Sequence, residues 1–201
     1  METKTELKAP KVSFGNKKLP KDTMIFNIPA VNTCPGKTEF CASKCYAVKA
    51  ERQYPQVLPA RKHNLKLTLD PSFVSLMIGT IAKYQKKIKQ VRIHEAGDFY
   101  SQAYLDSWFL IAKEFPGIVF YAYTKSFHLE FSAKPSNFVL IASFDQTTTE
   151  KAFALYQFRR KWFDNTFRIV QKGASANCIQ DCTKCHLCWS AKGLNLTVNV
   201  H

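Results

Sequence analysis

Hydrophobic and polar positions alternate along the chain between short strand-like runs and longer helix-like stretches from about residue 22 onward. Apolar residues recur every three or four positions after Ser72 and after Ser101, a spacing that predicts two amphipathic helices. A third helix is predicted where Thr147 and Glu150 have the spacing of a capping box. The apolar stripes of the first two helices are Phe73, Met77, Ile81, Tyr84 and Ile88, and Tyr104, Trp108, Ile111 and Phe115.

Short apolar runs between these helices predict strands. The runs cover residues 24–29, 91–96, 117–123, 138–143, 167–171 and 194–200. The two strongest middle runs are nearly uninterrupted, which is typical of strands buried on both faces. Strands that alternate with helices favour a mostly parallel sheet, and we predict an α/β fold of the partial (βα) barrel type.

Polar residues follow each apolar run, at the point where the predicted strand ends. Because parallel folds place their sites at the carboxyl ends of strands, these residues are expected to meet at one edge of the sheet. They are Asn32 and Cys34 after the first run, then His94, Glu95 and Asp98, then Tyr123, Thr124, Lys125 and Ser126, and finally Ser143 and Asp145.

The chain has 201 residues, 46% of them hydrophobic, which predicts a folded protein rather than a disordered one. We expect a lysine-rich arm at residues 1–21 and a single α/β iron–sulfur domain at 22–201. Lys and Arg total 29 against 15 Asp and Glu, a formal charge of +14. Such an excess is either a set of solvated faces or a surface for a polyanion such as nucleic acid.

The N-terminal residues are polar, and no uncharged apolar run approaches the roughly 18 residues that a membrane span needs. We therefore expect a cytoplasmic protein with no membrane partner. The chain has seven cysteines, an odd number that argues against a disulfide framework. Their spacing favours metal binding by reduced thiols.

Cys34, Cys41 and Cys45 share one predicted loop, directly after the first strand of the parallel series, and Tyr46 follows the last of them. Three thiolates are able to hold three irons of a [4Fe–4S] cluster and leave the fourth iron open. An open iron binds substrate or activates water.

Cys178, Cys182, Cys185 and Cys188 lie within eleven residues in a cysteine-rich C-terminal segment. The two-residue spacings favour an iron–sulfur cluster, with zinc as the alternative metal. Two arrangements stay open: an open three-thiolate site with a closed four-thiolate site, or one cluster shared by both groups with spare cysteines.

Four blocks of sequence stand out as a set: Thr33–Thr38 with Cys41 and Cys45–Ala47, His94–Ser101, Tyr121–Ser126 and Cys185–Trp189. Together they resemble the phage gene product 88 family. The resemblance implies a phage-encoded protein that acts in the bacterial cytoplasm, with distant kinship to radical S-adenosylmethionine (SAM) enzymes and their partial barrel. In those enzymes an aromatic residue often stands beside a cluster cysteine, which implies a cofactor-binding role for Tyr46 and leaves SAM open as a cofactor.

The function expected from these features is an enzyme with an iron–sulfur cluster at the carboxyl edge of the sheet. His94, Glu95 and Asp98 are candidate acid–base groups, with Gly97 providing the bend that brings Asp98 round, and Lys125 is a candidate ligand for an anionic small molecule. The chemistry is either Lewis-acid hydrolysis or hydration, or SAM-type radical chemistry. The alternatives are a non-catalytic metal-cluster protein that binds nucleic acid, and an electron-transfer protein.

Overall fold

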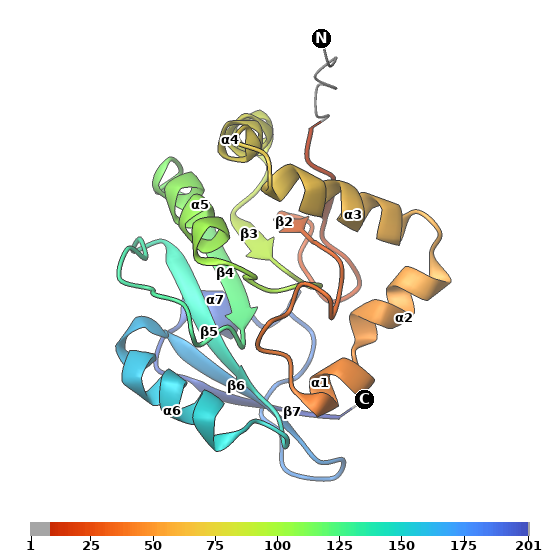
Figure 1. Ribbon diagram of the computed structural model, residues 1–201, viewed down its shortest axis with the longest axis vertical. Coiled ribbons are helices and arrows are strands. Elements are labelled where there is room, and N and C mark those ends of the chain that lie inside the picture. Colours follow the sequence, from red (N-terminus) through yellow and green to blue (C-terminus); the bar gives the residue numbers. More distant parts are fainter. Residues whose placement is uncertain (1–8, 201) are drawn as a thin grey trace.

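The computed structural model describes residues 9–200, which form one seven-stranded sheet (Figure 1). The strands lie in the sheet in the order in which they occur in the chain. Strands β2 to β7 are parallel, and β1 pairs antiparallel with β2. The predicted α/β class and mostly parallel sheet are therefore confirmed. The strands are β1 (Val12–Phe14), β2 (Thr23–Phe26), β3 (Gln90–Ile93), β4 (Val119–Thr124), β5 (Phe138–Phe144), β6 (Asn165–Val170) and β7 (Asn195–Asn199).

Helices join most of the parallel strands. Four of them lie between β2 and β3: α1 (Glu39–Ser43), α2 (Tyr46–Gln53), α3 (Val57–Thr68) and α4 (Phe73–Tyr84). The later connections contain α5 (Gln102–Lys113), α6 (Glu150–Arg159) with the 3-10 turn η1 (Arg160–Trp162), and α7 (Leu187–Ser190). The β4–β5 connection has no helix, and it buries Phe127, Leu129 and Phe131 instead.

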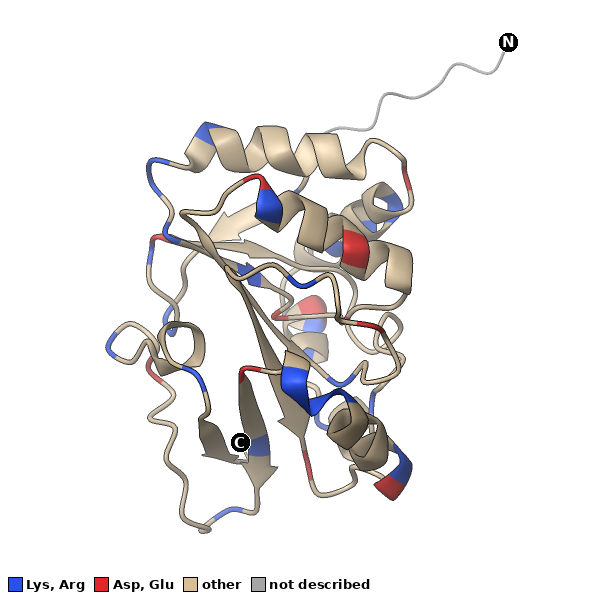
Figure 2. Cartoon of the chain, turned by 90° about the vertical axis from the view of Figure 1, so that its left-hand side faces the viewer, with Lys and Arg blue, Asp and Glu red and all other residues tan. Residues whose placement is uncertain are grey.

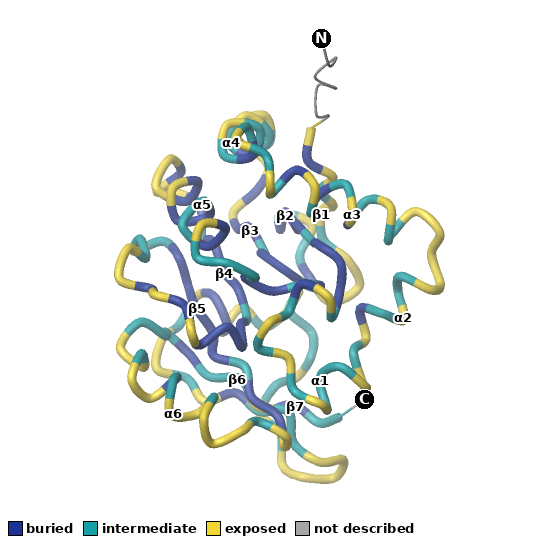
Figure 3. The backbone as a smooth tube through the Cα atoms, viewed as in Figure 1, coloured by how far each residue is buried: buried dark blue, intermediate teal, exposed yellow. Residues whose placement is uncertain are grey.

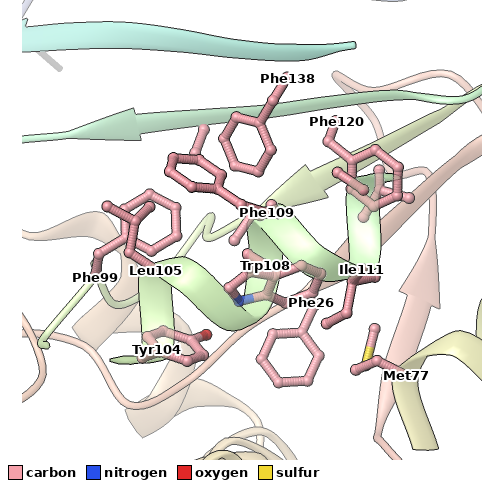
Figure 4. Close-up of a cluster of buried hydrophobic side chains, with 14 of the residues drawn as sticks. Phe26, Met77, Phe99, Tyr104, Leu105, Trp108, Phe109, Ile111, Phe120 and Phe138 are labelled. Atoms are coloured by element: carbon pink, nitrogen blue, oxygen red, sulfur yellow. The ribbon is translucent and has the colours of Figure 1, made fainter. Parts of the chain in front are cut away.

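The main core lies between one face of the sheet and helices α4 and α5. Trp108 of α5 packs against Phe26 of β2 and Phe73 of α4, with ring centroids 5.2 and 5.7 Å apart (Figure 4). Phe109 meets Phe138 of β5 edge to face at 5.0 Å. The predicted stripes of both helices are thus the faces that hold them on the sheet.

The opposite face of the sheet, here called the inner face, carries Arg92, Tyr121 and Tyr123. Successive side chains of a strand point to opposite faces, and Tyr121 lies between Phe120 and Ala122, which both belong to the main core. The inner face packs against the segment that holds α7, through Cys188 and Trp189. The central strands are therefore largely buried (Figure 3).

Two predicted boundaries move for local reasons. The strand expected over 91–96 ends at Ile93, because His94 adopts a left-handed φ of 65°. The N-cap of α6 is Thr149, whose hydroxyl accepts a hydrogen bond from the Ala152 amide, whereas Thr147 bonds to the Asp145 carboxylate. By contrast, Ser101 caps α5 as predicted, accepting from the Tyr104 amide at 3.3 Å.

Part of the segment expected to be an arm is joined to the sheet. Residues 1–8 lie outside the described residues, but β1 extends the sheet beside β2. The Asn64 side chain of α3 also bonds to both backbone polar groups of Lys11 at 2.8 Å. Among the described residues, the helices are too short or too polar to cross a membrane.

Candidate functional site

The loops that follow β2 and β3 are tied together at the carboxyl edge of the sheet. Asn27 Oδ1 accepts hydrogen bonds from the amides of Glu95 and Ala96 at 2.7 and 2.9 Å. Gly97 has a φ of 90°, and a Cβ there would lie 2.2 Å from Ile28 Cγ1. Only glycine fits this turn without strain. The predicted bend at Gly97 is therefore present, and it brings Asp98 back to the sheet.

Asp98 is buried and joins the ends of β3 and β4. Its Oδ1 accepts from the Thr124 hydroxyl at 2.6 Å, and its Oδ2 accepts from the Lys125 amide at 2.9 Å. Burial raises the pKa of Asp98, and these hydrogen bonds oppose the rise because they favour the carboxylate. Asp98 is thus held in place by the backbone and side chains of the neighbouring loop.

Lys125 and Asp145 lie side by side at the ends of β4 and β5. Lys125 Nζ is 3.1 Å from Asp145 Oδ2 and 3.2 Å from the Ser143 hydroxyl. The Thr38 hydroxyl donates to the same Asp145 oxygen at 2.7 Å. Burial opposes ionisation of Asp145, but the bond from Thr38 and the charge of Lys125 outweigh it and hold its pKa below the ordinary value.

The first cysteine group lies against these residues. Thr38 is also the N-cap of α1 and accepts from the Cys41 amide at 3.0 Å, so the cap residue connects Cys41 to Asp145. The loop passes so close to β4 that a Cβ on Gly36 would lie 2.1 Å from the Lys125 carbonyl oxygen. The position of this cysteine loop therefore depends on the residues at the ends of β4 and β5.

The thiols of Cys34, Cys41 and Cys45 interact electrostatically with one another, and those of Cys34 and Cys41 also interact with Asp98. Burial and the charge of Asp98 raise the pKa of Cys34 to about 12, and thiolate charge on Cys41 and Cys45 adds to the rise. Burial also raises the pKa of Cys41, while the Lys125 ammonium lowers it. The three predicted thiol ligands, Asp98 and Lys125 thus come together as expected.

Tyr46 and Glu95 form the side of this group nearest β3. The Tyr46 hydroxyl donates to the Glu95 carbonyl oxygen at 2.6 Å, although its ring is exposed. Glu95 Oε1 accepts a hydrogen bond from the side-chain amide of Asn16 at 2.9 Å. Tyr46 is therefore placed directly beside Cys45, with its hydroxyl fixed by backbone rather than by an acid–base partner.

His94 points away from the group and into the core. Its Nε2 lies 2.8 Å from the Tyr104 hydroxyl of α5, and its ring packs edge-on against Phe99 at 5.0 Å. Burial, with a smaller contribution from Arg92, lowers the pKa of His94 to about 3. The structure therefore corrects the expectation that His94 joins Glu95 and Asp98: the left-handed turn at His94 directs its imidazole to the opposite side.

The second cysteine group lies in the β6–β7 connection and packs on the inner face. Trp189 of α7 meets Tyr121 with ring centroids 4.9 Å apart. The Tyr123 hydroxyl donates a hydrogen bond to the Cys188 thiol, and burial raises the pKa of Cys188. Burial, followed by thiolate charge on Cys188, raises the pKa of Cys182 to about 11. Charge on Cys178 and Cys185 acts on both thiols in the same direction, so the four cysteines form one group.

Arg92 lies between the two groups, a placement that the sequence analysis missed. Its guanidinium stands over the Tyr123 ring at 4.0 Å and the Tyr121 ring at 5.1 Å. Tyr46 and Glu95 also interact with the Arg92 charge, and that charge lowers the pKa of Cys182 in the second cysteine group. Side chains alternate between the two faces of a strand, and Arg92 pairs with Tyr121 in the sheet register. This alternation was the signal that could have placed Arg92 on the same face as Tyr121.

Nowhere in residues 9–200 do three His, Cys, Asp or Glu side chains stand in the geometry that holds a single metal ion. A [4Fe–4S] cluster makes a different demand, because each thiolate ligates a separate iron. The first group offers three thiols, and the second offers four thiols with the His186 imidazole beside them, packed on Trp189 at 5.4 Å. Thiolates are the ligands that iron–sulfur clusters use.

The profile of the family described as Gene product 88 matches residues 3–191, a range that contains all seven cysteines. The chain belongs to the Gene product 88 family.

Two relatives of this family are both called Gene 88 protein. The one from Mycobacterium phage L5 is 28% identical over 185 residues, covering 78% of this chain and 77% of the relative. The one from Mycobacterium phage D29 is 32% identical over 128 residues, covering 52% of this chain and 53% of the relative. No solved structure matches the chain, and nothing in these comparisons supports the expected kinship with radical SAM enzymes.

Proposed function

We propose that this phage protein is an iron–sulfur protein of the host cytoplasm, with a cluster held by the thiolates of Cys34, Cys41 and Cys45. The observation that carries the proposal is the gathering of these thiols beside Lys125, at the carboxyl edge of the parallel sheet. Parallel α/β proteins use this edge for their sites.

The fold proposed for this function is a partial (βα) barrel of the radical-SAM-like kind. Three features support it. The parallel strands follow one another in chain order, helices α4, α5 and α6 pack on one face, and the cysteine-rich segment packs on the other. A (βα) barrel likewise has its helices outside the wall and packed side chains inside it.

Three thiolates leave one iron of a [4Fe–4S] cluster open, and such an iron supplies Lewis-acid chemistry or, with SAM, radical chemistry. The chain's own contribution is the environment. Lys125 provides a positive charge that favours thiolate at Cys41 and is able to bind an anionic substrate group. Asp98 and Asp145 hold Lys125 by its backbone and its ammonium, respectively.

A second, closed centre is proposed at Cys178, Cys182, Cys185 and Cys188, with iron–sulfur favoured and zinc as the alternative. An unpartnered polar atom supports a bound group here. Within the described residues the buried Tyr121 hydroxyl has no hydrogen-bond partner, and charge on Cys182 and Cys188 acts on it. The Tyr123 hydrogen bond to Cys188 is the kind of outer contact that orients a ligand and tunes its metal.

The test is anaerobic purification with counts of iron, sulfide and zinc per chain. Cys41→Ala is expected to lower iron and sulfide while leaving metal at the second group, and Cys185→Ala is expected to do the reverse. Ser43→Ala is the matched control, because Ser43 lies in the same short helix as Cys41 and is exposed. Unchanged iron in Cys41→Ala would refute the first site. Loss of zinc instead of iron in Cys185→Ala would show that the second group holds zinc.

The enzymatic part of the proposal has its own test. A cluster with an open iron is expected to change its electron paramagnetic resonance spectrum when SAM or a small carboxylate is added. Lys125→Met is expected to weaken the response to the carboxylate. A reduced cluster whose spectrum is the same with and without either compound would rule out the open iron and leave an electron-transfer or structural role.

A further inference from the structure

Two lysine-rich segments that are far apart in the sequence meet at the amino edge of the sheet. The β1–β2 turn carries one set of lysines, and the end of α4 with the segment after it carries the other. The Lys89 amide donates to the Asp22 carbonyl oxygen at 3.0 Å, so the segments lie side by side. Basic residues are visible at the end of α4 and in the loop that follows it (Figure 2). The lysines are Lys17, Lys18, Lys21, Lys83, Lys86, Lys87 and Lys89.

These seven lysines are exposed and almost without counter-charge. Lys89 has Asp22 at 3.8 Å, and within residues 9–200 the other six form no ion pair. Some cations elsewhere are matched, as in Lys134 with Asp164 at 2.7 Å and Arg61 with Glu51 at 2.8 Å. Other exposed lysines, such as Lys62 and Lys151, are scattered over separate helices. The charge excess of the chain is therefore partly concentrated on this edge. Such a concentration attracts polyanions and their counter-ions.

An aromatic pair lies within the same surface. Phe14, at the end of β1, and Tyr84, at the end of α4, have ring centroids 4.8 Å apart. Phe14 is 39% exposed, and Lys83 Nζ stands over the Tyr84 ring at 5.6 Å. A lipid surface or free phosphate needs only the charge. An exposed Phe14 ring and a half-buried Tyr84 ring among cations also suit nucleic-acid bases, which stack on aromatic faces.

We propose that the seven lysines with Phe14 and Tyr84, here called the amino-edge surface, bind single-stranded nucleic acid. The lysines neutralise successive phosphates, and the rings provide a place for a base to stack. This proposal is independent of any metal, because none of these lysines and rings belongs to either cysteine group. It gives the family member a nucleic-acid partner and the place of contact.

The first test is the salt dependence of binding by the full-length protein to fluorescent 20-nucleotide dT and rU strands. Contact with about six phosphates predicts a slope of log K against log salt of about −4. The triple variant Lys18→Gln, Lys86→Gln, Lys87→Gln is expected to reduce the slope by about 2 units, since each lost contact removes about 0.7. The control Lys62→Gln, Lys66→Gln, Lys151→Gln removes the same charge from exposed positions on α3 and α6.

Three outcomes would overturn the proposal. They are an absence of binding at about 50 mM salt, equal weakening in the two triple variants, and equally salt-sensitive binding to phosphatidylserine vesicles. The stacking component is tested by Tyr84→Leu, with circular dichroism to confirm the fold. We expect it to weaken single-strand binding about tenfold. Unchanged affinity would show that the rings take no part in binding.

Discussion

Lys125 and Asp145 form an ion pair at 3.1 Å in which the side chains are only 8% and 0% exposed. The pair joins the ends of β4 and β5, and through Thr38 it also holds the start of α1, where Cys41 lies. A buried pair of this kind fixes geometry more than it adds stability. Its place here is to hold the first cysteine loop against the sheet.

Lys125→Met is expected to lower the free energy of unfolding by about 3–5 kcal/mol, because it leaves the Asp145 charge buried without its partner. Urea denaturation at pH 7 measures the loss. The double variant Lys125→Met, Asp145→Asn is expected to recover part of it. Lys37→Met, an exposed change in the same loop, is the control and is expected to stay within about 0.5 kcal/mol. A loss in Lys125→Met no larger than in the control would contradict this account.

His94 predicts a specific loss of stability in mild acid. Its pKa is about 3 in the folded protein and near 6.5 when unfolded, so the unfolded chain binds the extra proton between these values. The contribution of neutral His94 is complete above about pH 6.5 and is lost as the pH falls, by about 1.4 kcal/mol per unit.

Between pH 6.5 and 5, His94 is expected to lower the free energy of unfolding by about 2 kcal/mol. This pH-dependent loss is expected to be absent in His94→Asn, and asparagine is chosen because it tolerates the left-handed backbone. The exposed His128→Gln is the control and is expected to keep the slope of the parent protein. If the parent and His94→Asn have the same pH dependence, His94 is not the buried neutral group described above.

Gly97 and Gly79 provide a matched pair for testing the turn that places Asp98. Gly97→Ala puts a methyl group 2.2 Å from Ile28 in a left-handed backbone, and it is expected to lower the free energy of unfolding by about 2 kcal/mol or more. Gly79→Ala, in the middle of α4 where a Cβ meets no other atom within 4 Å, is expected to raise the free energy of unfolding by about 0.5–1 kcal/mol. Thermal melting is the measurement, and the prediction fails if the two changes shift the midpoint in the same direction.

Tyr123→Phe tests the hydrogen bond to Cys188. Loss of a donor to a thiolate is expected to reduce metal retained at the second cysteine group under chelator challenge by about tenfold, the lower end of outer-contact effects. Metal at the first group is expected to be unchanged. Tyr54→Phe, at an exposed site on the C-terminal side of α2, is the control. Equal retention in Tyr123→Phe and the parent protein would show that the hydroxyl does not act on the bound group.

Most of the sheet was predictable because its strands carry uninterrupted apolar runs, as Phe138–Phe144 does. Helix α3 was not predicted, and its buried residues explain why. Arg61 and Asn64 are buried there through bonds to Glu51 and to the backbone of Lys11, so the apolar period that marks a helix is missing. Polar burial of this kind depends on partners that a single sequence does not reveal.

The candidate site was predictable as far as the strand ends determine it. Asp98, Lys125 and the first three cysteines meet because parallel strands share a carboxyl edge. The orientation of His94 depends on one backbone dihedral, and the place of Arg92 depends on strand register. Neither is encoded in hydrophobic periodicity, so the sequence placed His94 in the site and left Arg92 out.

The chain-order sheet has a consequence for synthesis. Each strand pairs with the one made just before it, so the sheet is able to grow one strand at a time as the chain leaves the ribosome. All residues of the first cysteine group and its supports are present once β5 and Asp145 have emerged. The second group waits for β7, near the end of translation. The two cysteine groups are therefore completed in sequence, the one at the carboxyl edge first and the one on the inner face last.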